Sequence, residues 1–327
     1  MKKKLSRISV ILFLLVLSLS GCSGSSAYTP TPEGETYTPA ENVTMLAPFD
    51  AGGAIDILGR NIGTIMTTEG IVDCNFIYEN QGGAYGQVGL AVIVNQRVGD
   101  ENVLIPISST YVTLQALQND GYSYKDLTIV AQVANDYNMV VVNADSDFYT
   151  MEDLLEAGQE KSLLAASSGT GVSYVLASRI GLEGNLQNLR ILPCDGSSEQ
   201  IINLLGNQVD FSCNNPGEIG QYIESGDLRV LAVTAPERLK DYPDVPTLKE
   251  CGLDIEDSVS RGLAMAPGVS ESARQYWMDR AKELFDTEAF QTQYIETNSM
   301  TSEFLPGDEY AERLEEQWDI YDEVLRE

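Results

Sequence analysis

The sequence predicts an α/β fold, in which strands alternate with helices. Short apolar runs and stretches of helical periodicity follow one another along most of the chain, which is the pattern of strands connected by helices. The length of 327 residues allows two domains of about 150 residues each. Apolar residues make up 43% and charged residues 21%, a composition that builds a packed core and excludes a wholly disordered or coiled-coil protein.

Eight apolar runs predict strands, and seven amphipathic or polar stretches predict helices. The strands are expected at residues 43–47, 75–78, 103–107, 139–142, 163–166, 189–192, 209–211 and 230–233. The helices are expected at residues 55–66, 87–94, 172–180, 199–205, 218–223, 270–285 and 308–326. Strands alternating with helices predict parallel sheets that are covered on both faces.

Charge and residue content exclude several classes of function. The formal net charge is -29, so the chain is poorly suited to bind the phosphates of nucleic acid. It contains no histidine, which excludes Ser-His-Asp and Cys-His catalysis and every metal site with a histidine ligand. Dinucleotide, P-loop and zinc-protease motifs are also absent from the sequence. We therefore expect no catalytic residue, no metal and no cofactor.

The first 21 residues have the parts of an export signal. Lys2, Lys3, Lys4 and Arg7 precede an apolar run at residues 8–19, which is too short to span a bilayer. The run ends in Leu19-Ser20-Gly21-Cys22, which resembles a bacterial lipobox and implies that a lipid on Cys22 anchors the protein. The alternative is an ordinary cleaved signal that happens to contain a cysteine.

Residues 22–42 are rich in Ser, Thr, Pro and Gly and predict a flexible tether between the anchor and the folded body. The protein is therefore expected outside the cytoplasm, anchored to a membrane, in the periplasm or on the cell surface.

The remaining four cysteines show no metal-ligand or C-x-x-C spacing. We expect Cys74, Cys194, Cys213 and Cys251 to be isolated buried thiols, although three disulfide pairings stay open in an oxidising compartment. Trp277 and Trp318 are expected to be packing residues.

Three strand-to-helix connections are rich in small residues: residues 47–56, 79–86 and 166–173. The first turn of a helix leaves N–H groups without intrahelical partners, and Gly or Ala beside them lets an anion approach. A carboxylate fits such an arrangement without Arg or Lys. Asp56, early in its helix, either compensates the helix dipole or accepts a hydrogen bond from a ligand.

These and later motifs resemble those of extracytoplasmic solute receptors of the tripartite tricarboxylate transporter system, the Bug-type receptors. The resemblance covers about residues 43–327. Its most specific part is Gly226-Asp-Leu-Arg-Val-Leu-Ala-Val-Thr234, followed by Tyr242-Pro-Asp-Val-Pro-Thr247 and Glu250-Cys-Gly252. It also includes Ala47-Pro-Phe-Asp-Ala-Gly-Gly-Ala-Ile-Asp56, Glu79-Asn-Gln-Gly-Gly-Ala-Tyr-Gly86, Ser167-Ser-Gly-Thr-Gly171 and Asn203-Leu-Leu-Gly-Asn-Gln-Val-Asp-Phe211.

The resemblance implies a type II periplasmic-binding-protein fold, with two α/β lobes, a hinge and a ligand cleft between the lobes. Lobe one would comprise residues 43–137 and 258–327, the last stretch carrying the C-terminal helices. Lobe two would comprise residues 138–257.

The same resemblance implies ligand-binding residues on five segments. They are Phe49, Ala51, Gly52, Gly53 and Asp56, then Gly83 and Ala84, then Ser108 and Ser109, then Ser168, Thr170 and Gly171, and finally Asp195. Asp195 adds a negative charge near the expected cleft. This charge disfavours a tricarboxylate and favours a monocarboxylate, an amino acid, or a carboxylate bearing hydroxyl or amine groups.

The function implied is a receptor, not an enzyme, that binds a small organic carboxylate and delivers it to a membrane transporter of one large and one small subunit. Two alternatives stay open. A lipoprotein of this fold could serve as a carboxylate sensor or scaffold, and neighbouring transporter genes would separate this from transport. An extracytoplasmic hydrolase would need a pair of carboxylates facing an open cleft.

Overall fold

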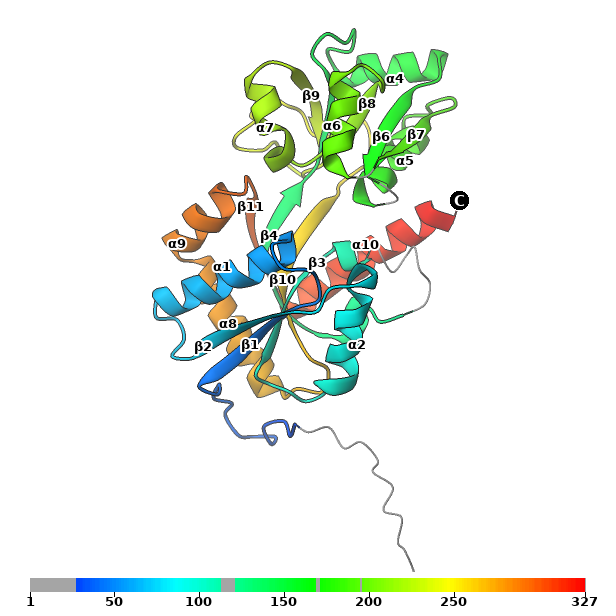
Figure 1. The fold of residues 1–327 in the computed structure, drawn as a ribbon. Helices are drawn as coiled ribbons and strands as arrows, with labels where there is room; N and C mark the ends of the chain where they lie inside the picture. The colour runs from blue at the N-terminus through cyan, green and yellow to red at the C-terminus, as the bar shows by residue number, and fades with distance from the viewer. Residues whose placement is uncertain (1–27, 113–120, 169–170, 195, 327) are drawn as a thin grey trace, which may run out of the picture.

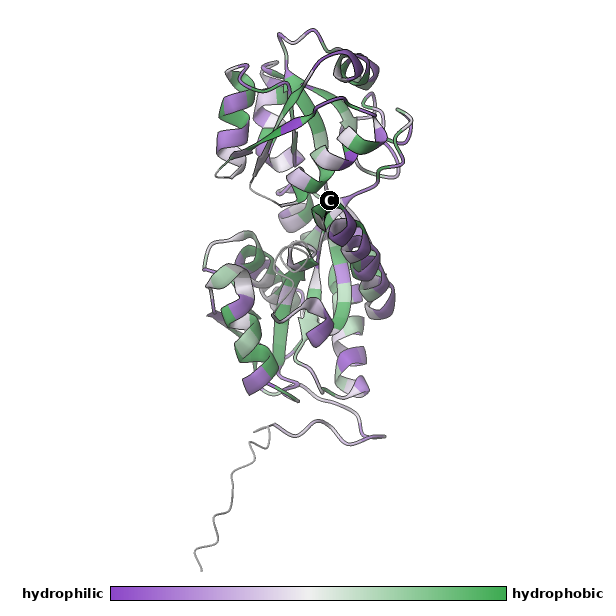
Figure 2. Cartoon of the chain, turned by 90° about the vertical axis from the view of Figure 1, so that its right-hand side faces the viewer, coloured by the Kyte–Doolittle hydropathy of each residue, from purple (hydrophilic) through white to green (hydrophobic). Residues whose placement is uncertain are grey.

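Two lobes, each built around its own β-sheet, make up the computed structural model, which describes residues 28–112, 121–168, 171–194 and 196–326. Figure 1 shows the lobes one above the other, with helices on both faces of each sheet. Figure 2 shows hydrophobic strands inside and hydrophilic helix faces outside. The predicted α/β class and the two-lobe arrangement are confirmed.

Lobe one contains a six-stranded sheet with the order β11-β4-β10-β3-β1-β2. Its strands are β1 (Asn42–Ala47), β2 (Asn75–Asn80), β3 (Val103–Ser108), β4 (Thr128–Tyr137), β10 (Ser258–Met265) and β11 (Thr301–Pro306). Its helices and helical turns are α1 (Ala54–Thr68), η1 (Ala84–Gly86), α2 (Gln87–Gln96), η2 (Tyr124–Asp126), α8 (Glu271–Phe285), α9 (Glu288–Phe290), η3 (Gln291–Glu296) and α10 (Gly307–Arg326).

Lobe two contains a five-stranded sheet with the order β7-β6-β8-β5-β9. Its strands are β5 (Met139–Asn143), β6 (Leu164–Ser168), β7 (Arg190–Cys194), β8 (Phe211–Asn214) and β9 (Leu228–Val233). Its helices are α4 (Met151–Glu160), α5 (Val172–Glu183), α6 (Ser197–Leu205) and α7 (Pro216–Glu224). The chain enters this lobe from β4 and returns to lobe one through β10.

The prediction of parallel sheets is wrong for the strands that cross between the lobes. β1 is parallel to β2 and β3, and β6 is parallel to β7 and β8, as predicted. β10, however, is antiparallel to both β3 and β4, and β5 is antiparallel to β8 and β9. A chain that leaves one lobe and returns must run in opposite directions in its two crossings, so the crossing strands β4 and β10 pair antiparallel. The sequence pattern predicted neither β4 nor β10.

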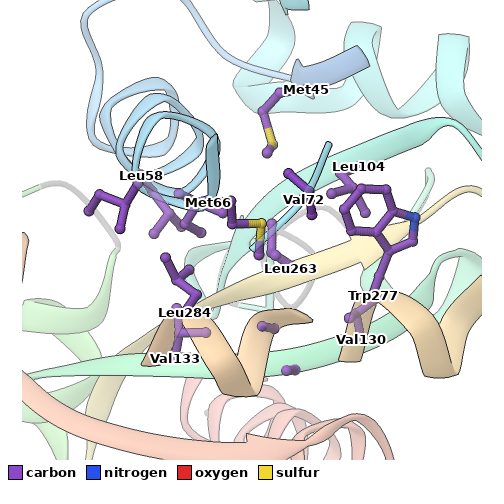
Figure 3. Close-up of a cluster of buried hydrophobic side chains, with 14 of the residues drawn as sticks. Met45, Leu58, Met66, Val72, Leu104, Val130, Val133, Leu263, Trp277 and Leu284 are labelled. Carbon is purple, nitrogen blue, oxygen red and sulfur yellow. The ribbon is translucent and has the colours of Figure 1, made fainter. Parts of the chain in front are cut away.

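Helix α1 covers the parallel part of the first sheet because its apolar residues recur at helical spacing. Leu58, Ile62 and Met66 are fully buried along one stripe. They meet Leu104 and Leu263 of the sheet and Leu284 of α8 in one hydrophobic cluster, which Figure 3 shows together with Trp277. Gly59 brings the helix close to the strands, since a Cβ there would lie 2.9 Å from Met45 Cγ and 3.0 Å from Pro106 Cγ.

The hinge is held by a short chain of hydrogen bonds between the two crossings. Asn138 follows β4, Thr234 follows β9, and Asp257 precedes β10. Thr234 N–H donates to Asn138 O (2.9 Å), and Asn138 N–H donates to Thr234 Oγ1 (2.9 Å). Thr234 Oγ1 in turn donates to Asp257 O (2.6 Å). The two crossings therefore form one connected element, about which the lobes can bend.

The C-terminal helix α10 connects this hinge to both lobes. The buried Asp257 carboxylate accepts hydrogen bonds from the Tyr321 hydroxyl (2.9 Å) and from Gln317 Nε2 (2.9 Å), both on α10. Tyr321 and Leu314 also share a hydrophobic cluster with Val175 of α5, a residue of lobe two. Helix α10 therefore spans the boundary between the lobes, as Figure 1 also shows.

The last part of the predicted tether lies against lobe one in the structure. Tyr37 is 4% exposed, and its hydroxyl donates to Glu101 O (2.9 Å). Thr31 donates from its N–H and its hydroxyl to the Glu101 carboxylate (3.0 and 2.6 Å). Residues 28–41 thus follow the surface of the lobe, because Tyr37 inserts an aromatic ring between Tyr276 and Trp277. Cys22 lies outside the described residues.

The four predicted thiols are free, and Cys74, Cys194 and Cys213 are buried while Cys251 is partly exposed. Within the described ranges, no group of Cys, Asp and Glu side chains is arranged to hold a metal ion. Over the same residues, no helix has both the length and the apolar character needed to cross a membrane.

Replacing Trp277 with alanine should destabilise the protein far more than the same change at Trp318. Trp277 is fully buried and contacts the rings of Tyr276, Phe76 and Tyr37, whereas Trp318 is only partly buried. Trp277→Ala should lower the free energy of unfolding by about 3–5 kcal/mol. Urea unfolding of the two variants measures the difference, and equal losses would contradict the core described here.

The stability of the protein should depend on the protonation of Asp257. Burial raises the pKa of Asp257 to about 6, although hydrogen bonds from Tyr321 and Gln317 act to lower it. The pKa in the unfolded chain is about 3.9, so the folded state binds the proton more tightly. The stability that the raised pKa of Asp257 contributes is fully present below pH 4. It is lost as the pH rises through 6, by at most about 1.4 kcal/mol per pH unit.

Asp257→Asn should remove this dependence, because the amide keeps an acceptor for Tyr321 and carries no charge. The free energy of unfolding, measured by urea titration at pH 4.5, 5.5, 6.5 and 7.5, gives the difference between wild type and variant. If the difference in free energy of unfolding between wild type and Asp257→Asn does not change with pH, folding does not raise the pKa of Asp257.

Candidate functional site

The carboxyl ends of the parallel strands in both lobes point towards the boundary between the lobes. In lobe one, Ser108 at the end of β3 pairs with Arg261, three residues after the start of β10 at the hinge. In lobe two, Asn214 at the end of β8 pairs with Met139, the first residue of β5 after the hinge. Because β6 is parallel to β8, its carboxyl end lies on the same side. In sheets of this kind ligands bind at the strand carboxyl ends, so the boundary is where a site is expected.

The connection from β1 to α1 presents small, exposed residues at this boundary. Ala51, Gly52 and Gly53 are exposed, and Gly52 has φ +83°, a conformation that favours glycine. Gly53 is the N-cap of α1 and, among the described residues, no side chain caps this helix. The first N–H groups of α1, at residues 54–56, therefore need partners from outside the helix.

Asp56 positions this connection through hydrogen bonds within the chain. Its carboxylate is 5% exposed and accepts from Gly52 N–H (2.8 Å), Arg60 Nε (2.9 Å) and Asn80 Nδ2 (3.1 Å). Burial acts to raise the pKa of Asp56, but these three hydrogen bonds outweigh it and lower that pKa. The Gly52 N–H is thus not free for a ligand, and Asp56 holds the loop that presents the other amides.

The connection from β2 to α2 lies directly against the first one. Gly83 (φ +122°) and Ala84 (φ +46°) are exposed and have left-handed backbone conformations. A Cβ on Gly82 would overlap the Asp50 carboxylate, and one on Gly86 would lie 3.1 Å from the Phe49 ring. The glycines of the second loop are therefore required by the first loop, and both loops form one surface.

Ser108 and Ser109 do not offer free hydroxyls. Both are buried, at 1% and 0% exposure. Ser109 Oγ accepts from Ser260 N–H (3.1 Å) and donates to Ser258 O (3.3 Å), while Ser108 Oγ accepts from Thr110 N–H (3.3 Å). The antiparallel strand β10 thus takes up the hydrogen bonds of the Ser109 hydroxyl, and Ser108 Oγ accepts a bond from its own turn. That either residue contacts a ligand stays a prediction.

Phe49 is also a packing residue of the site, since its ring lies 5.4 Å from that of Tyr111, which follows β3. This contact brings the segments after β1 and β3 together. The three connections of lobe one that follow β1, β2 and β3 therefore lie together at one edge of the sheet.

In lobe two, two helices begin at glycines on the side that faces lobe one. Gly171 is the N-cap of α5 and Gly196 (φ +96°) is the N-cap of α6, and in the described part of the chain neither helix receives a capping side chain. Ser168 ends β6, but its side chain lies outside the described part, as do Thr170 and Asp195. Val172 and Val175, in the first turn of α5, pack against the hydrophobic cluster of lobe one, so this helix starts at the lobe boundary.

The capping of the helices separates the boundary from the rest of the molecule. Helices α1, α5 and α6 have a glycine N-cap and, within the described residues, no side-chain capping bond. Helix α2 also begins at a glycine, but its first N–H groups, of Gln87 and Val88, donate to Ala84 O and Gly83 O of the preceding turn. Helices α4, α8 and α9 are capped by the hydroxyls of Thr150, Ser270 and Thr287, respectively. The sequence reasoning missed Gly196 as an N-cap, although glycine is one of the residues that begin helices.

The loops at the boundary carry no cationic side chain. The sequence has no Lys or Arg at residues 48–59, 79–96, 103–112, 164–178 or 191–199. Uncapped helix termini supply partial positive charge at these places and can hold an anion. This arrangement can bind a negatively charged group.

Two surface cavities lie elsewhere. One, of about 270 Å³, is lined by Tyr37, Cys74 and Tyr276 at the far end of lobe one. The other, of about 320 Å³, lies between Leu182 of α5 and Ile320 of α10. Neither contains the strand ends or the uncapped helix termini, so we do not assign the solute site to them.

Comparison with known proteins gives consistent results. The family model described as "Tripartite tricarboxylate transporter family receptor" matches residues 68–301. A Pseudomonas sp. (strain P51) protein, the "UPF0065 protein in tcbD-tcbE intergenic region", is 29% identical over 216 residues, which are 65% of this chain and 63% of that protein. Protein BugT of Bordetella pertussis is 24% identical over 243 residues, covering 72% of this chain and 74% of that protein.

Among solved structures, a TctC solute binding protein from Polaromonas is similar with a TM-score of 0.80 and 22% identity, covering 89% of this chain and 99% of that one. MatC from Rhodopseudomonas palustris, solved with bound malate, is similar with a TM-score of 0.65 and 20% identity, covering 88% and 100% of the two chains. These similarities confirm the predicted two-lobe periplasmic-binding-protein fold.

The family match extends over more than half of the chain and includes both crossings between the lobes. It confirms that the protein is an extracytoplasmic solute-binding receptor and not an enzyme. The chain belongs to the tripartite tricarboxylate transporter receptor family.

Proposed function

We propose that this protein is a lipid-anchored receptor that binds a small organic carboxylate between its lobes and delivers it to a tripartite tricarboxylate-type transporter in the membrane. The observation that carries the proposal is the set of three uncapped helix N-termini, on α1, α5 and α6, at the strand ends of both lobes. Amides from both lobes would hydrogen-bond the carboxylate, and the hinge would bend as the lobes close on it.

The energies of such contacts suit this function. A hydrogen bond to a charged group contributes roughly 1.5–3 kcal/mol, and micromolar binding requires about −8 kcal/mol. A few amide bonds from each lobe reach this range. The net charge of -29 does not prevent binding, because exposed charges beyond about 8–10 Å are screened while the amides touch the ligand.

Similar receptors support the choice of a carboxylate. MatC was solved with bound malate, and R. palustris Rpa4515, with a TM-score of 0.71 and 18% identity, was solved with adipate. In this chain the backbone of Gly53, Gly83, Ala84 and Gly171 would contact the carboxylate, whereas Gly52, whose N–H donates to Asp56, would only line the site. Ser168, Thr170 and Asp195 would face it from lobe two, and Asp195 would favour a solute that also carries a hydroxyl or amine group.

The anchoring part of the proposal rests on the sequence Leu19-Ser20-Gly21-Cys22 and on the short apolar run before it. A lipid on Cys22 and a tether up to about residue 27 would hold lobe one near the membrane, since residues 28–41 already contact that lobe. The large and small membrane subunits of the transporter would be the partners.

Adding a carboxylate at the N-cap of α1 should abolish solute binding without unfolding the protein. Gly53 has φ −76°, and the nearest atom to a Cβ there is Asp50 O at 3.4 Å, so Gly53→Asp fits the backbone. The new side chain would cap the helix and occupy the place of the solute. We expect wild type to bind one of malate, succinate, adipate, lactate or glutamate at micromolar strength, and Gly53→Asp to bind it at least tenfold more weakly.

Isothermal titration calorimetry and the shift in melting temperature measure this binding. Ser270→Asp is the matched control, because it adds the same charge at the N-cap of α8, away from the site. A wild-type protein that is folded but binds no carboxylate would count against the proposal, as would equal affinities for wild type and Gly53→Asp.

A further inference from the structure

Arg261 is a buried cation on the hinge strand β10, on the sheet face that α1 covers. Its cross-strand partner is Ser108, so the two side chains project from the same face. Leu263 and Pro106 form the next pair on this face, and Leu263 belongs to the hydrophobic cluster of α1. Arg261 is 8% exposed, and its pairing with Ser108, the last residue of β3, places it at the strand ends of lobe one.

The position of α1 places its uncapped terminus at the level of Arg261. Gly59 of α1 lies over Pro106. One helical turn towards the N-terminus leads to Ile55 and Asp56, and two strand residues towards the hinge lead from Pro106 to Ser108. Asp56 contacts Asn80, the last residue of β2, which confirms that the first turn of α1 lies at the strand ends. The N-terminus of α1 and Arg261 are thus neighbours.

The hydrogen-bonding groups of Arg261 are incompletely used. Its nearest anion is Asp136 on β4, with 3.7 Å between Arg261 Nη2 and Asp136 Oδ2, which is longer than a hydrogen bond. Among the described residues, neither Arg261 Nε nor Asp136 Oδ1 has a hydrogen-bond partner, although each side chain is only 10% exposed. The other hydrogen-bonding neighbour of the guanidinium is the side chain of Tyr294. Buried charges normally have their bonds satisfied, so this loose pair leaves donors available to another anion.

We propose that Arg261 is a ligand-binding residue, whose guanidinium leaves Asp136 and takes a carboxylate of the solute beneath the N-terminus of α1. This inference rests on the proposed function and adds a side-chain cation to a site otherwise made of amides. A guanidinium offers two parallel donors to a carboxylate, which an isolated amide does not.

If the guanidinium of Arg261 moves from Asp136 to the solute, the pKa of Asp136 should change. This carboxyl faces Arg261 of β10, Asn215 and Glu218 of α7, and Tyr294 of η3. Burial raises the pKa of Asp136 to about 6, and Arg261 acts to lower it. When the solute takes Arg261, the carboxyl loses its one cationic neighbour and its pKa rises further. Ligand binding at pH 7 should then be accompanied by uptake of a proton from solvent, up to one per solute.

Titration calorimetry of the full-length wild type with malate, adipate and glutamate, in Hepes and in Tris at pH 7.2, measures this uptake. The binding heats in the two buffers differ by the number of protons taken up times the difference in buffer ionisation enthalpy. We expect a net uptake for wild type and none for Asp136→Asn, which has no carboxyl to protonate. Equal proton uptake in wild type and Asp136→Asn, or no uptake in wild type, would overturn the exchange.

Affinities of paired variants test the contact itself, with Asp136 replaced in each one so that no carboxylate is left buried without its cation. Asp136→Asn combined with Arg261→Gln should bind the same probe at least tenfold more weakly than Asp136→Asn alone, and combination with Arg261→Lys should give an intermediate affinity. Arg274→Gln is the matched control, since this mostly buried arginine of α8 donates to Ile129 O and lies away from the site. Its affinity should equal that of wild type.

The outcomes separate the two proposals. If wild type binds a probe and the Asp136→Asn protein binds it equally well with and without Arg261, the Arg261 contact is wrong and the receptor function stands. If wild type binds none of the probes, both are overturned. Melting temperatures of all variants, measured in parallel, show that each one is folded.

Discussion

Unpaired N–H groups at the first turn of a helix are the constraint on which the architecture of this protein depends. Every helix has them, and the chain satisfies them with hydroxyl side chains at α4, α8 and α9. At α1, α5 and α6 it places glycine instead, on the edges of the two sheets that meet at the lobe boundary. Under the proposed function, a bound anion would accept hydrogen bonds from these N–H groups, and its binding would be coupled to the approach of the lobes.

The hinge would allow the lobes to close on a bound solute. Asn138, Thr234 and Asp257 join the two crossings through backbone and hydroxyl hydrogen bonds, so the crossings bend together. Helix α10 reaches the same point through Tyr321 and Gln317 and continues to α5 of lobe two. The hinge is therefore connected to a helix of 20 residues that contacts both lobes.

The distribution of charged residues also bears on the proposed site. Exposed acidic residues are screened by water and salt, and the site loops contain no Lys or Arg. Of the carboxylates near the site, Asp56 is held by three hydrogen bonds, and Asp136 lies 3.7 Å from Arg261. Binding of an anionic solute by a strongly acidic protein is thus compatible with simple electrostatics.

Much of the fold could be read from local pattern. Apolar periodicity located α1 and the parallel strands within a few residues, because burial of one face dictates the spacing of apolar residues. The motifs identified the family, which the comparisons confirmed. The glycine-rich connections were recognisable because a missing side chain at a helix start is visible in the sequence itself.

What the sequence alone could not decide depends on contacts between distant residues. Ser109 was predicted to face a ligand, but the antiparallel strand β10, some 150 residues later, takes up the hydrogen bonds of its hydroxyl. Arg261 gave no signal, since one arginine in an apolar run shows its burial and its loose partner Asp136 only when the strands are paired. Sequence therefore determined the elements and the small-residue loops, whereas tertiary pairing decided which polar groups are satisfied internally and which stay available to a solute, because hydrogen-bond satisfaction is a property of neighbours in space.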